Sequence, residues 1–506
     1  MFLPKHQPRR DCSQYRMRKP LNVLWFKRDL RLTDHEPLAL ALSADEPLML
    51  LYIVEPKMLV HSNYSDMHWR FVWEALTDLS QRIERFGGGL KIAFADPKTV
   101  FSALNQKFEI KAVFSHAETG LKATYERDKT MANYFVKNNI LWKESQQNGV
   151  IRRLKSRQSW QKRWYGYMAS KVSVPDLTRL ENLSVLEKTE IARGLPYPSW
   201  TVNHPMRQSA KKEKAMRYLE SFCSDRSKNY SKGISKPELS RKSCSRISPY
   251  LSWGIFSVRE VYQAMDLAKK SRKGSKMGIN SAMTRLRWHC HFIQKFEMEE
   301  RIEYENFNKA YDRLKKPVNA KLLGAWMTGR TGFPMVDACM RCLRETGYIN
   351  FRMRAMLTSF AVHHLWQPWK PVSMHLSRIF LDFEPGIHYP QIQMQAGMTG
   401  INTIRIYNPV KQSIDQDPHG TFIKKWVPEL ADLPEDAIHK PWELGPIDQQ
   451  LFDFHPGRNY PFPIVDLDKA RKAASDQLYG TRKTKTGRTE SRRILAKHTN
   501  PGPRNA

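Results

Sequence analysis

A hydroxyl-bearing turn stands just before a predicted helix in the middle of the chain. Residues 244–248 read Cys-Ser-Arg-Ile-Ser, and the helical segment PYLSWG follows directly at 249–254. Backbone N–H groups and hydroxyls at a helix N-terminus bind phosphate well. The same pattern also fits an ordinary N-cap at Ser248. The residues alone therefore indicate either a phosphate site or a simple cap.

Thiols and imidazoles offer a second kind of chemistry. Cys339 and Cys342 form a C-x-x-C pair, and no second pair follows it in the sequence. On a helix this spacing puts both thiols on one face, which favours a structural pair over a metal site. His363 and His364 are predicted to be helix-surface or core histidines. We therefore expect no bound metal.

The charge of the chain points to a polyanionic partner. Its 506 residues include 83 Lys and Arg against 50 Asp and Glu, a formal net charge of +33. Nucleic acid is the first expectation and an anionic membrane surface the second. No run of about 18 apolar residues predicts a membrane span, and the basic N-terminus lacks the apolar segment of a secretory signal. With six scattered cysteines, we expect a cytoplasmic monomer, associated with the nucleoid if the source is bacterial.

Two kinds of periodicity divide the chain. Short apolar runs at 22–26, 48–53, 91–94 and 112–115 alternate with helical patterns such as 67–86. This alternation predicts a parallel, Rossmann-like α/β sheet. From about residue 248 to 381 nearly every segment reads as helix, which predicts an all-α domain.

The expected organisation has five segments. Residues 1–20 form a basic arm and 21–150 the α/β domain. A connector at 151–235 leads to the helical domain at 236–468. Residues 469–506 are rich in Lys and Arg with only two acids, which predicts a basic, disordered tail.

Several short motifs follow one another in a characteristic order along the sequence. The second half contains AWMTGRTGFPMVDACMRCLRETGYINFRMRAM, then LDFEP and IRIYNPVKQS. Near the start, WFKRDLRLTDHEPL coincides with the end of the first apolar run. Together they resemble the cryptochrome/photolyase family over about residues 21–465. The resemblance implies an α/β domain followed by an all-α FAD-binding domain, and a light-driven flavoprotein whose usual substrate is ultraviolet-damaged DNA.

The resemblance also implies a set of cofactor contacts. The turn at 244–248 would wrap the FAD phosphates, and Arg354 and Asp382 match an ion pair beside the flavin ring. Glu118 falls near a folate-contacting glutamate, so the sheet's crevice could lodge an antenna chromophore, whether folate, deazaflavin or another. The expected cofactor residues are Tyr230, Cys244 (a threonine in the family), Ser245, Arg246, Ile247, Ser248, Arg354, Asp382, Phe383 (a glycine in the family), Glu384 and Glu118.

The positions that would meet damaged DNA are partly altered. Trp288 matches the tryptophan that stacks on the flipped lesion, but Arg285 stands where the family has a base-contacting glutamate. His388 takes the place of the asparagine that faces the flavin N5. The expected DNA contacts are Arg285, Trp288, His289, Phe351 (an asparagine in the family), Arg352, Met394 (a second tryptophan in the family) and Gln412.

The family's three-tryptophan electron relay is incomplete in this sequence. Trp369 matches its middle member, whereas Ile392 occupies the position next to the flavin and the outer position falls near Lys316. Trp366, three residues before Trp369, is expected on the same helical face. Other aromatic candidates are Trp326, Tyr389 and Tyr407, and each could equally be a core residue.

Three functions are compatible with these residues. The first is light-dependent repair, in which excited reduced FAD gives an electron to a flipped-out pyrimidine dimer. The net charge and Trp288 favour it. The second is a cryptochrome-type blue-light photoreceptor, favoured by the altered pocket positions. The third is a nucleic-acid-binding flavoprotein without photochemistry.

Overall fold

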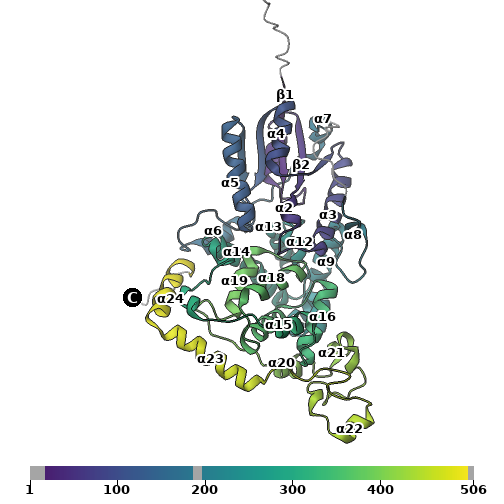
Figure 1. The fold of residues 1–506 in the computed structure, drawn as a ribbon. Coiled ribbons are helices and arrows are strands. Elements are labelled where there is room, and N and C mark those ends of the chain that lie inside the picture. Colours follow the sequence, from purple (N-terminus) through teal and green to yellow (C-terminus); the bar gives the residue numbers. More distant parts are fainter. Residues whose placement is uncertain (1–17, 186–195, 500–506) are drawn as a thin grey trace, which may run out of the picture.

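The alternation of strand and helix patterns is followed by a change to helix alone, and the structure divides in the same way. A computed structural model describes residues 18–185 and 196–499. Its α/β part lies at one end and its helical part at the other (Figure 1). Among the described residues, no helix is both long and apolar enough to cross a bilayer.

The sheet has five parallel strands in the order β3-β2-β1-β4-β5. Alternate residues of β1 face opposite sides, so Val23 packs toward α4 and α5 and Leu24 toward α1 and α3. The four predicted strands are confirmed. The fifth was missed because Leu141–Ser145 is an edge strand with mostly exposed residues. The elements are β1 (Lys19–Phe26), α1 (Glu36–Ser43), β2 (Leu48–Val54), α2 (Pro56–Leu59), α3 (Asp66–Glu84), β3 (Leu90–Phe94), α4 (Pro97–Lys107), β4 (Phe108–His116), α5 (Lys122–Lys137) and β5 (Leu141–Ser145).

Helices follow almost without interruption. The predicted connector contains short helices, and the helical part is already established at α9, before residue 236. The main elements are α6 (Trp160–Ala169), α7 (Leu180–Leu183), α8 (Pro198–Thr201), α9 (Lys212–Ser224), η2 (Arg226–Asn229), α10 (Tyr230–Gly233), α11 (Pro237–Ser243), α12 (Ser248–Ser252), α13 (Val258–Lys270), α14 (Lys276–Glu297), α15 (Ala320–Thr328), α16 (Pro334–Thr346), α17 (Phe351–Ser359), the π-helical turn η5 (Phe360–His364), α18 (Trp369–Ile379), α19 (Pro385–Gln395), α20 (Pro409–Gln416), α21 (Thr421–Trp426) and α22 (Pro446–Leu451).

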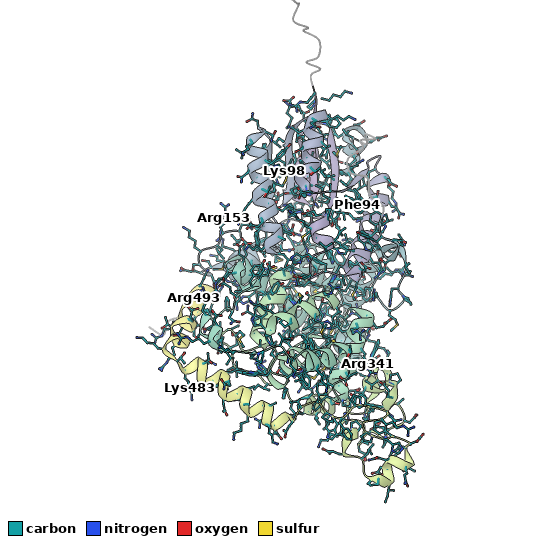
Figure 2. The ribbon with its side chains drawn as sticks, viewed as in Figure 1. Phe94, Lys98, Arg153, Arg341, Lys483 and Arg493 are labelled. Atoms are coloured by element: carbon teal, nitrogen blue, oxygen red, sulfur yellow. The ribbon has the colours of Figure 1, made fainter. Side chains whose placement is uncertain are left out.

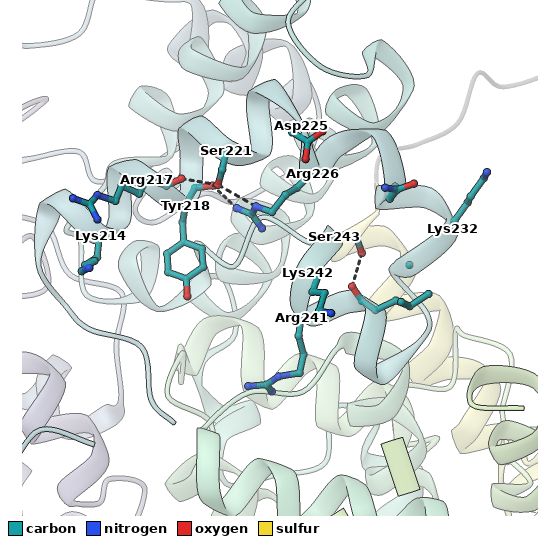
Figure 3. Close-up of a pocket in the computed structure, with 13 residues that line it drawn as sticks. Lys214, Arg217, Tyr218, Ser221, Asp225, Arg226, Lys232, Arg241, Lys242 and Ser243 are labelled. Atoms are coloured by element: carbon teal, nitrogen blue, oxygen red, sulfur yellow. Dashed lines mark hydrogen bonds between the residues drawn. The ribbon is translucent and has the colours of Figure 1, made fainter. Parts of the chain in front are cut away.

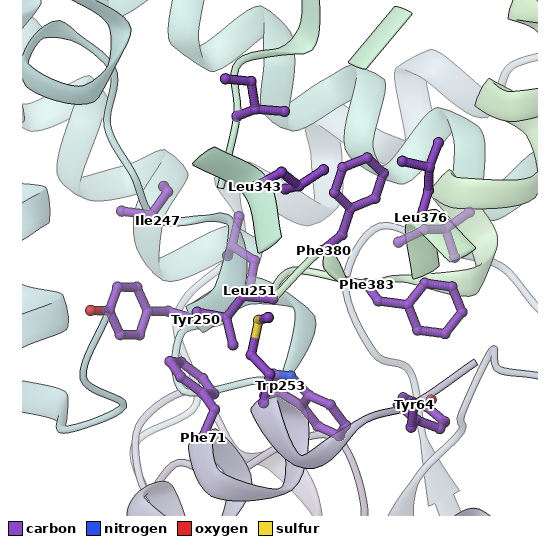
Figure 4. Packing of buried hydrophobic residues seen from close by; sticks show 14 of the residues in the cluster. Tyr64, Phe71, Ile247, Tyr250, Leu251, Trp253, Leu343, Leu376, Phe380 and Phe383 are labelled. Carbon is purple, nitrogen blue, oxygen red and sulfur yellow. The ribbon is translucent and has the colours of Figure 1, made fainter. Parts of the chain in front are cut away.

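The two parts share one apolar core. Tyr64, just before α3, lies 5.4 Å from the Phe383 ring and 6.0 Å from the Trp253 ring, measured between centroids. In Figure 4 these rings lie near Phe71 and Leu251, where the α/β part and the helical part are in contact. Burial of this aromatic surface fixes the orientation of the helical part against the sheet.

The prediction of a disordered tail is wrong for residues 469–498. They lie in α23 (Leu467–Lys483) and α24 (Lys485–His498), which run along the edge of the helical part where Lys483 and Arg493 are labelled (Figure 2). Leu478 and Ile494 are fully buried. Glu299 supplies the missing negative charge, because it accepts hydrogen bonds from Arg493 at 3.1 Å and from His498 at 2.8 Å. The amphipathic pattern of α23 and α24 cannot be recognised from their composition alone. The arm at 1–17 and the last residues, 500–506, lie outside the described part.

Replacing Leu478 with alanine tests whether these helices are docked in solution. Leu478→Ala should lower the free energy of unfolding by about 2–5 kcal/mol, because it leaves a cavity in a packed contact. Leu495→Ala is the matched control, since this leucine is 45% exposed and should cost about 0.5 kcal/mol or less. Urea unfolding measures both. Equal effects would mean that the tail does not pack as described.

Candidate functional site

The predicted phosphate turn is held in a left-handed kink. Arg246 has a φ of +61°, a conformation that is unfavourable for most residues. Gln208 supports it by donating to the Arg246 carbonyl at 2.9 Å and accepting from the guanidinium at 2.8 Å. The guanidinium also lies over the Tyr348 ring, 3.7 Å from its centroid. Contacts within the protein therefore fix the shape of the turn.

Arg226 binds the turn on the side of its backbone carbonyls. Its guanidinium donates to the carbonyls of Cys244 and Ser245, the second at 3.3 Å. The C=O and the following N–H of a trans peptide point in opposite directions. The N–H groups of Ser245 and Arg246 therefore face away from Arg226. The Ser245 and Ser248 side chains keep partial exposure.

Asp382 forms a two-pronged ion pair with Arg354. The guanidinium nitrogens lie 2.9 and 3.0 Å from the two carboxylate oxygens. Burial would raise the pKa of Asp382, but Arg354 and a hydrogen bond from Ser248 outweigh it, so the pKa lies below its ordinary value. The contact with Ser248 brings the ion pair and the phosphate turn together, as the sequence predicted.

These groups suit FAD. Outward-facing N–H groups and the Ser245 and Ser248 hydroxyls match a diphosphate. Arg354 offers a fixed positive charge for a ring that becomes negative on reduction, and it keeps 22% of its side-chain surface exposed within the helical part. The turn would hold the phosphates, and Arg354 with Asp382 would flank the ring.

Phe383 and Glu384 have other partners. The Glu384 carboxylate pairs with Arg28 at 3.3 Å and accepts from the Gly386 N–H at 3.2 Å. Phe383 is 1% exposed and packs against Tyr64 of the α/β part. The cofactor contacts predicted for these two side chains are not supported, because an internal cation and the shared core engage them instead.

Two histidines flank the ion pair. Burial lowers the pKa of His289 and of His388 to about 4, so both are neutral at pH 7. His289 is partly exposed and lies within electrostatic range of Arg28 and Asp382. His388 uses Nε2 on the hydroxyl and carbonyl of Ser373, both at 2.9 Å. Its role beside the flavin stays a prediction that depends on its other ring nitrogen.

Exposed aromatic side chains mark the predicted DNA face. Trp288 on α14 is 44% exposed and stacks on Phe292 at 5.7 Å. Arg285, one turn earlier, is exposed and hydrogen-bonded to Tyr230. Phe351, at the start of α17, is 47% exposed. Helices α14 and α17 both pack against α19, so one helix positions both aromatic residues.

The remaining predicted DNA residues are less accessible. Arg352 donates to Gln412 at 3.4 Å, and Gln412 is 8% exposed. Met394 on α19 is half-buried. Arg352 and Gln412 therefore form one polar unit, in which Arg352 is the member with a partly exposed side chain.

Trp366 and Trp369 do not share a helical face. Trp366 lies between η5 and α18 with a φ of +51°, and Trp369 begins α18. Pro368 separates them and ends the helical pattern. The Trp366 ring carries Lys316 Nζ 4.0 Å from its centroid, whereas Trp369 Nε1 donates to Asn306 at 2.7 Å. The two tryptophans therefore have different surroundings.

Comparison with known proteins agrees with this geometry. Residues 22–162 match the family model "DNA photolyase", and residues 282–479 match "FAD binding domain of DNA photolyase". The chain belongs to the cryptochrome/photolyase family. It is 26% identical to a Cryptochrome DASH of Gloeobacter violaceus over 90% of this chain and 95% of that protein. It is 25% identical to a deoxyribodipyrimidine photo-lyase of Alkalihalophilus pseudofirmus over 90% and 97%.

Solved structures confirm the fold. A bacterial class III photolyase from Agrobacterium tumefaciens superposes with a TM-score of 0.81 at 23% identity, covering 94% of this chain and all of the other. A cryptochrome from Synechocystis gives 0.82 at 21% identity with the same coverage. The predicted two-domain architecture is therefore confirmed.

The family's crevice at the sheet is narrow in this member. The cavity bounded by Trp25, Tyr52 and Trp253 measures about 50 Å³. Glu118, the predicted folate contact, is 6% exposed and bound to Arg127 at 2.6 Å. A space of this size suits a water molecule and not an aromatic chromophore. The structure therefore gives Glu118 an ion-pairing role.

A buried Asp-His-His cluster lies under the same edge of the sheet. Asp29 accepts from His116 Nδ1 at 2.6 Å, and His35 Nε2 lies 3.0 Å from the same carboxylate oxygen. His35 Nδ1 accepts the Leu38 N–H at 3.1 Å, so the tautomer of His35 is set. The Arg31 guanidinium lies 3.5 Å from His116 Nε2. Both imidazoles already face the Asp29 carboxylate, and the nearby guanidinium disfavours a cation. Arg28 and Asp29 do not pair with each other, since their partners Glu384 and His116 are distant in sequence.

Sequence reasoning missed Arg226 as a functional residue. It stands 18 positions before the first turn carbonyl that it binds, beyond the reach of a local motif. One signal was available. Residues 225–228 read Asp-Arg-Ser-Lys at the end of an amphipathic helical pattern, where a cation commonly meets unpaired carbonyls.

Asp382→Asn should lower the FAD content of the purified protein. The change removes the negative partner of Arg354. It should weaken FAD binding by about 3 kcal/mol at most, because Arg354 is partly exposed. The measurement is flavin released per chain after denaturation. Asp266→Asn is the control, since Asp266 on α13 pairs with Lys269 and Lys270, which are outside the cofactor residues. Equal flavin content in both variants would remove Asp382 from the cofactor site.

Proposed function

We propose that this protein repairs ultraviolet-damaged DNA with light, by electron transfer to a flipped-out pyrimidine dimer. The observation that carries the proposal is Trp288, an exposed aromatic face on the helix that also presents His289 toward Asp382. The relatives named deoxyribodipyrimidine photo-lyase support it. The net charge of +33 supplies the attraction to phosphates that base flipping needs.

FAD, when bound, supplies the light-driven one-electron chemistry, and the electron lent to the lesion returns once the dimer has opened. The chain's own residues bind and orient. Trp288 offers a stacking face for an unstacked base. Arg354 and Asp382 hold complementary charges at one place, and the neutral imidazole of His289 adds no further charge near Asp382.

A cryptochrome-type photoreceptor is the second candidate. Arg285 stands where a glutamate would accept hydrogen bonds from damaged bases, and it is engaged with Tyr230. This replacement removes an acceptor from the lesion site, which favours a signalling role. The deciding experiment is repair of defined cyclobutane and six-four lesions under blue light, with chemically reduced protein. Repair of neither lesion would overturn the first proposal.

Trp288→Ala tests recognition of a flipped base. Loss of one stacking partner should weaken binding to lesion-bearing DNA by about 1–3 kcal/mol, while undamaged duplex should bind almost unchanged. Phe86→Ala, which removes a 38% exposed aromatic residue at the end of α3, is the control. Gel-shift titrations at two salt concentrations measure all three proteins, and affinity should fall with salt in each. Equal losses on both DNAs for Trp288→Ala would exclude stacking on this residue.

Two chains of neighbouring aromatic rings begin near the loop around Asp382; we call each of them a series. One passes from His388 to Tyr389 at 5.5 Å and on to Trp369 at 6.4 Å. The other passes from Tyr64 to Trp69 at 5.2 Å and on to Trp200 at 6.3 Å. The second series ends at Tyr197, which is 56% exposed and 5.0 Å from Trp200. We propose that one of them replaces the incomplete relay, with a thiol in solution as the final electron donor.

Single substitutions distinguish the two series. If electrons pass through Trp369, Trp369→Phe should slow light-driven reduction of the bound oxidised FAD sharply, and Trp69→Phe should not. The reverse result assigns the route to the second series. Transient absorption should show the tryptophan radical disappear in the sensitive variant. Repair by pre-reduced protein should survive in both, because the lesion takes its electron from the cofactor. Unchanged photoreduction in both variants would exclude both series.

A further inference from the structure

A large basic cavity lies next to the phosphate turn and has no part in the proposed function. Its volume is about 800 Å³, and α9, η2, α10 and α11 surround it (Figure 3). Asp225 is its one acidic lining residue. We call this cavity the basic pocket. Its cationic residues are Lys214, Arg217, Arg226, Lys232, Arg241 and Lys242.

The basic pocket is separate from the flavin site. Ser245, Ser248, Arg354 and Asp382 do not line it. Arg226 lines it and also donates to the Cys244 and Ser245 carbonyls. The turn therefore has its N–H groups on one side and the basic pocket on the other.

Two half-buried arginines line the inner side of the pocket without an acidic partner among the described residues. Arg226 donates to backbone carbonyls and to the Ser221 hydroxyl at 3.1 Å. Arg241 donates to the Thr346 hydroxyl and the Tyr348 carbonyl, both at 3.4 Å. Burial lowers the pKa of Arg226, which reflects the cost of a partly desolvated charge. A bound anion would offset that cost.

The outer side of the pocket is also largely uncompensated, although Arg217 pairs with Glu213. Lys214, Lys232 and Lys242 are exposed and form no ion pair within the described part of the chain. The acid Asp225 is already paired with Lys228 at 3.2 Å. Charges of one sign around a concave surface concentrate the field and attract multiply charged anions.

The pocket also offers an aromatic surface. The Tyr218 ring is half-buried, and the Arg226 guanidinium lies 5.6 Å from its centroid. Leu239, 46% exposed, adds an apolar contact, and Asn229 adds an amide. A volume of this size accommodates a small organic ligand. The lining therefore suits a flat ring joined to a phosphate group, and not a bare inorganic anion alone.

We propose that the basic pocket binds a nucleoside phosphate. Arginine side chains bind phosphate oxygens bidentately, and lysines add point charges. The ligand has two possible sources with the same chemistry, a free nucleotide or one nucleotide of a bound DNA strand. This proposal does not rest on the repair function, because the pocket exists whichever reaction the flavin supports.

Titration calorimetry of the FAD-loaded protein tests the proposal with ADP, pyrophosphate and adenosine. ADP should bind saturably at one site, pyrophosphate more weakly and adenosine not measurably. Raising the salt concentration should weaken ADP binding, since the lysines are exposed and screened. Absence of saturable ADP binding would overturn the proposal.

Charge reversal locates the site. The double variant Lys232→Glu/Lys242→Glu should lose at least about tenfold in ADP affinity, as two charge-assisted contacts become repulsive. Lys57→Glu/Lys98→Glu is the matched control, because both lysines are exposed on the α/β part and outside the pocket. Neither double variant touches the flavin contacts, so FAD content should be unchanged. Equal ADP affinity in the two double variants would place the nucleotide elsewhere and overturn the assignment.

Competition with DNA identifies the source. If the pocket holds a nucleotide of a bound strand, ADP should displace a single-stranded oligonucleotide, and Lys232→Glu/Lys242→Glu should weaken DNA binding more than the control does. If the ligand is a free nucleotide, ADP and DNA should bind together, and the two double variants should bind DNA alike. Each result supports a nucleoside-phosphate site and assigns it to one source.

Discussion

Arg28 joins the two parts of the molecule at the edge of the cofactor site. From the end of β1 it donates to the Ser252 carbonyl at 2.9 Å and to the Phe383 carbonyl at 2.8 Å, and it pairs with Glu384. The chain can approach so closely only because residue 254 is glycine, whose added Cβ would lie 2.2 Å from the Arg28 carbonyl oxygen. One buried guanidinium thus fixes the end of α12 against the loop that carries Asp382. Removing it would leave Glu384 buried without a partner, a costly state.

Guanidinium groups also bind backbone carbonyls or hold them in place at the phosphate turn. Arg226 donates there to backbone carbonyls, and Arg246 donates to Gln208 while its own carbonyl accepts from that amide. Guanidinium groups suit this task because their five donors lie in one rigid plane. A part of the large positive charge therefore serves the interior, where it shapes the backbone, and is not simply a surface for polyanions. Rigid positioning of this kind keeps a binding site in one geometry before its ligand arrives.

The sequence was informative wherever a contact was local or followed a familiar word. It predicted the alternating strands, the Arg354–Asp382 pair and a turn at 244–248. It could not predict that Glu384 would pair with Arg28, because no periodicity connects residues so distant in the chain. Trp366 and Trp369 were assigned to one helix by spacing alone, yet η5 ends at His364, before Trp366, and α18 begins only at Trp369. In the tail, charge concealed the buried Leu478 and Ile494, and Glu299, the acid that binds the tail, is distant in sequence.

Arg285 changes the character of the site that Trp288 would serve. Its guanidinium is bound to the Tyr230 hydroxyl, so the face offered to DNA carries a donor and a positive charge where the resemblance implied an acceptor. A donor cannot accept hydrogen bonds from the N–H groups of a thymine pair, but it can bind the carbonyl oxygens of the same bases. Stacking on Trp288 depends on the flat face of an extruded base, so the presence of Arg285 in place of a glutamate does not affect it. Recognition at this face therefore depends on stacking and on carbonyl or phosphate oxygens, a combination that also fits lesions other than the simplest dimer.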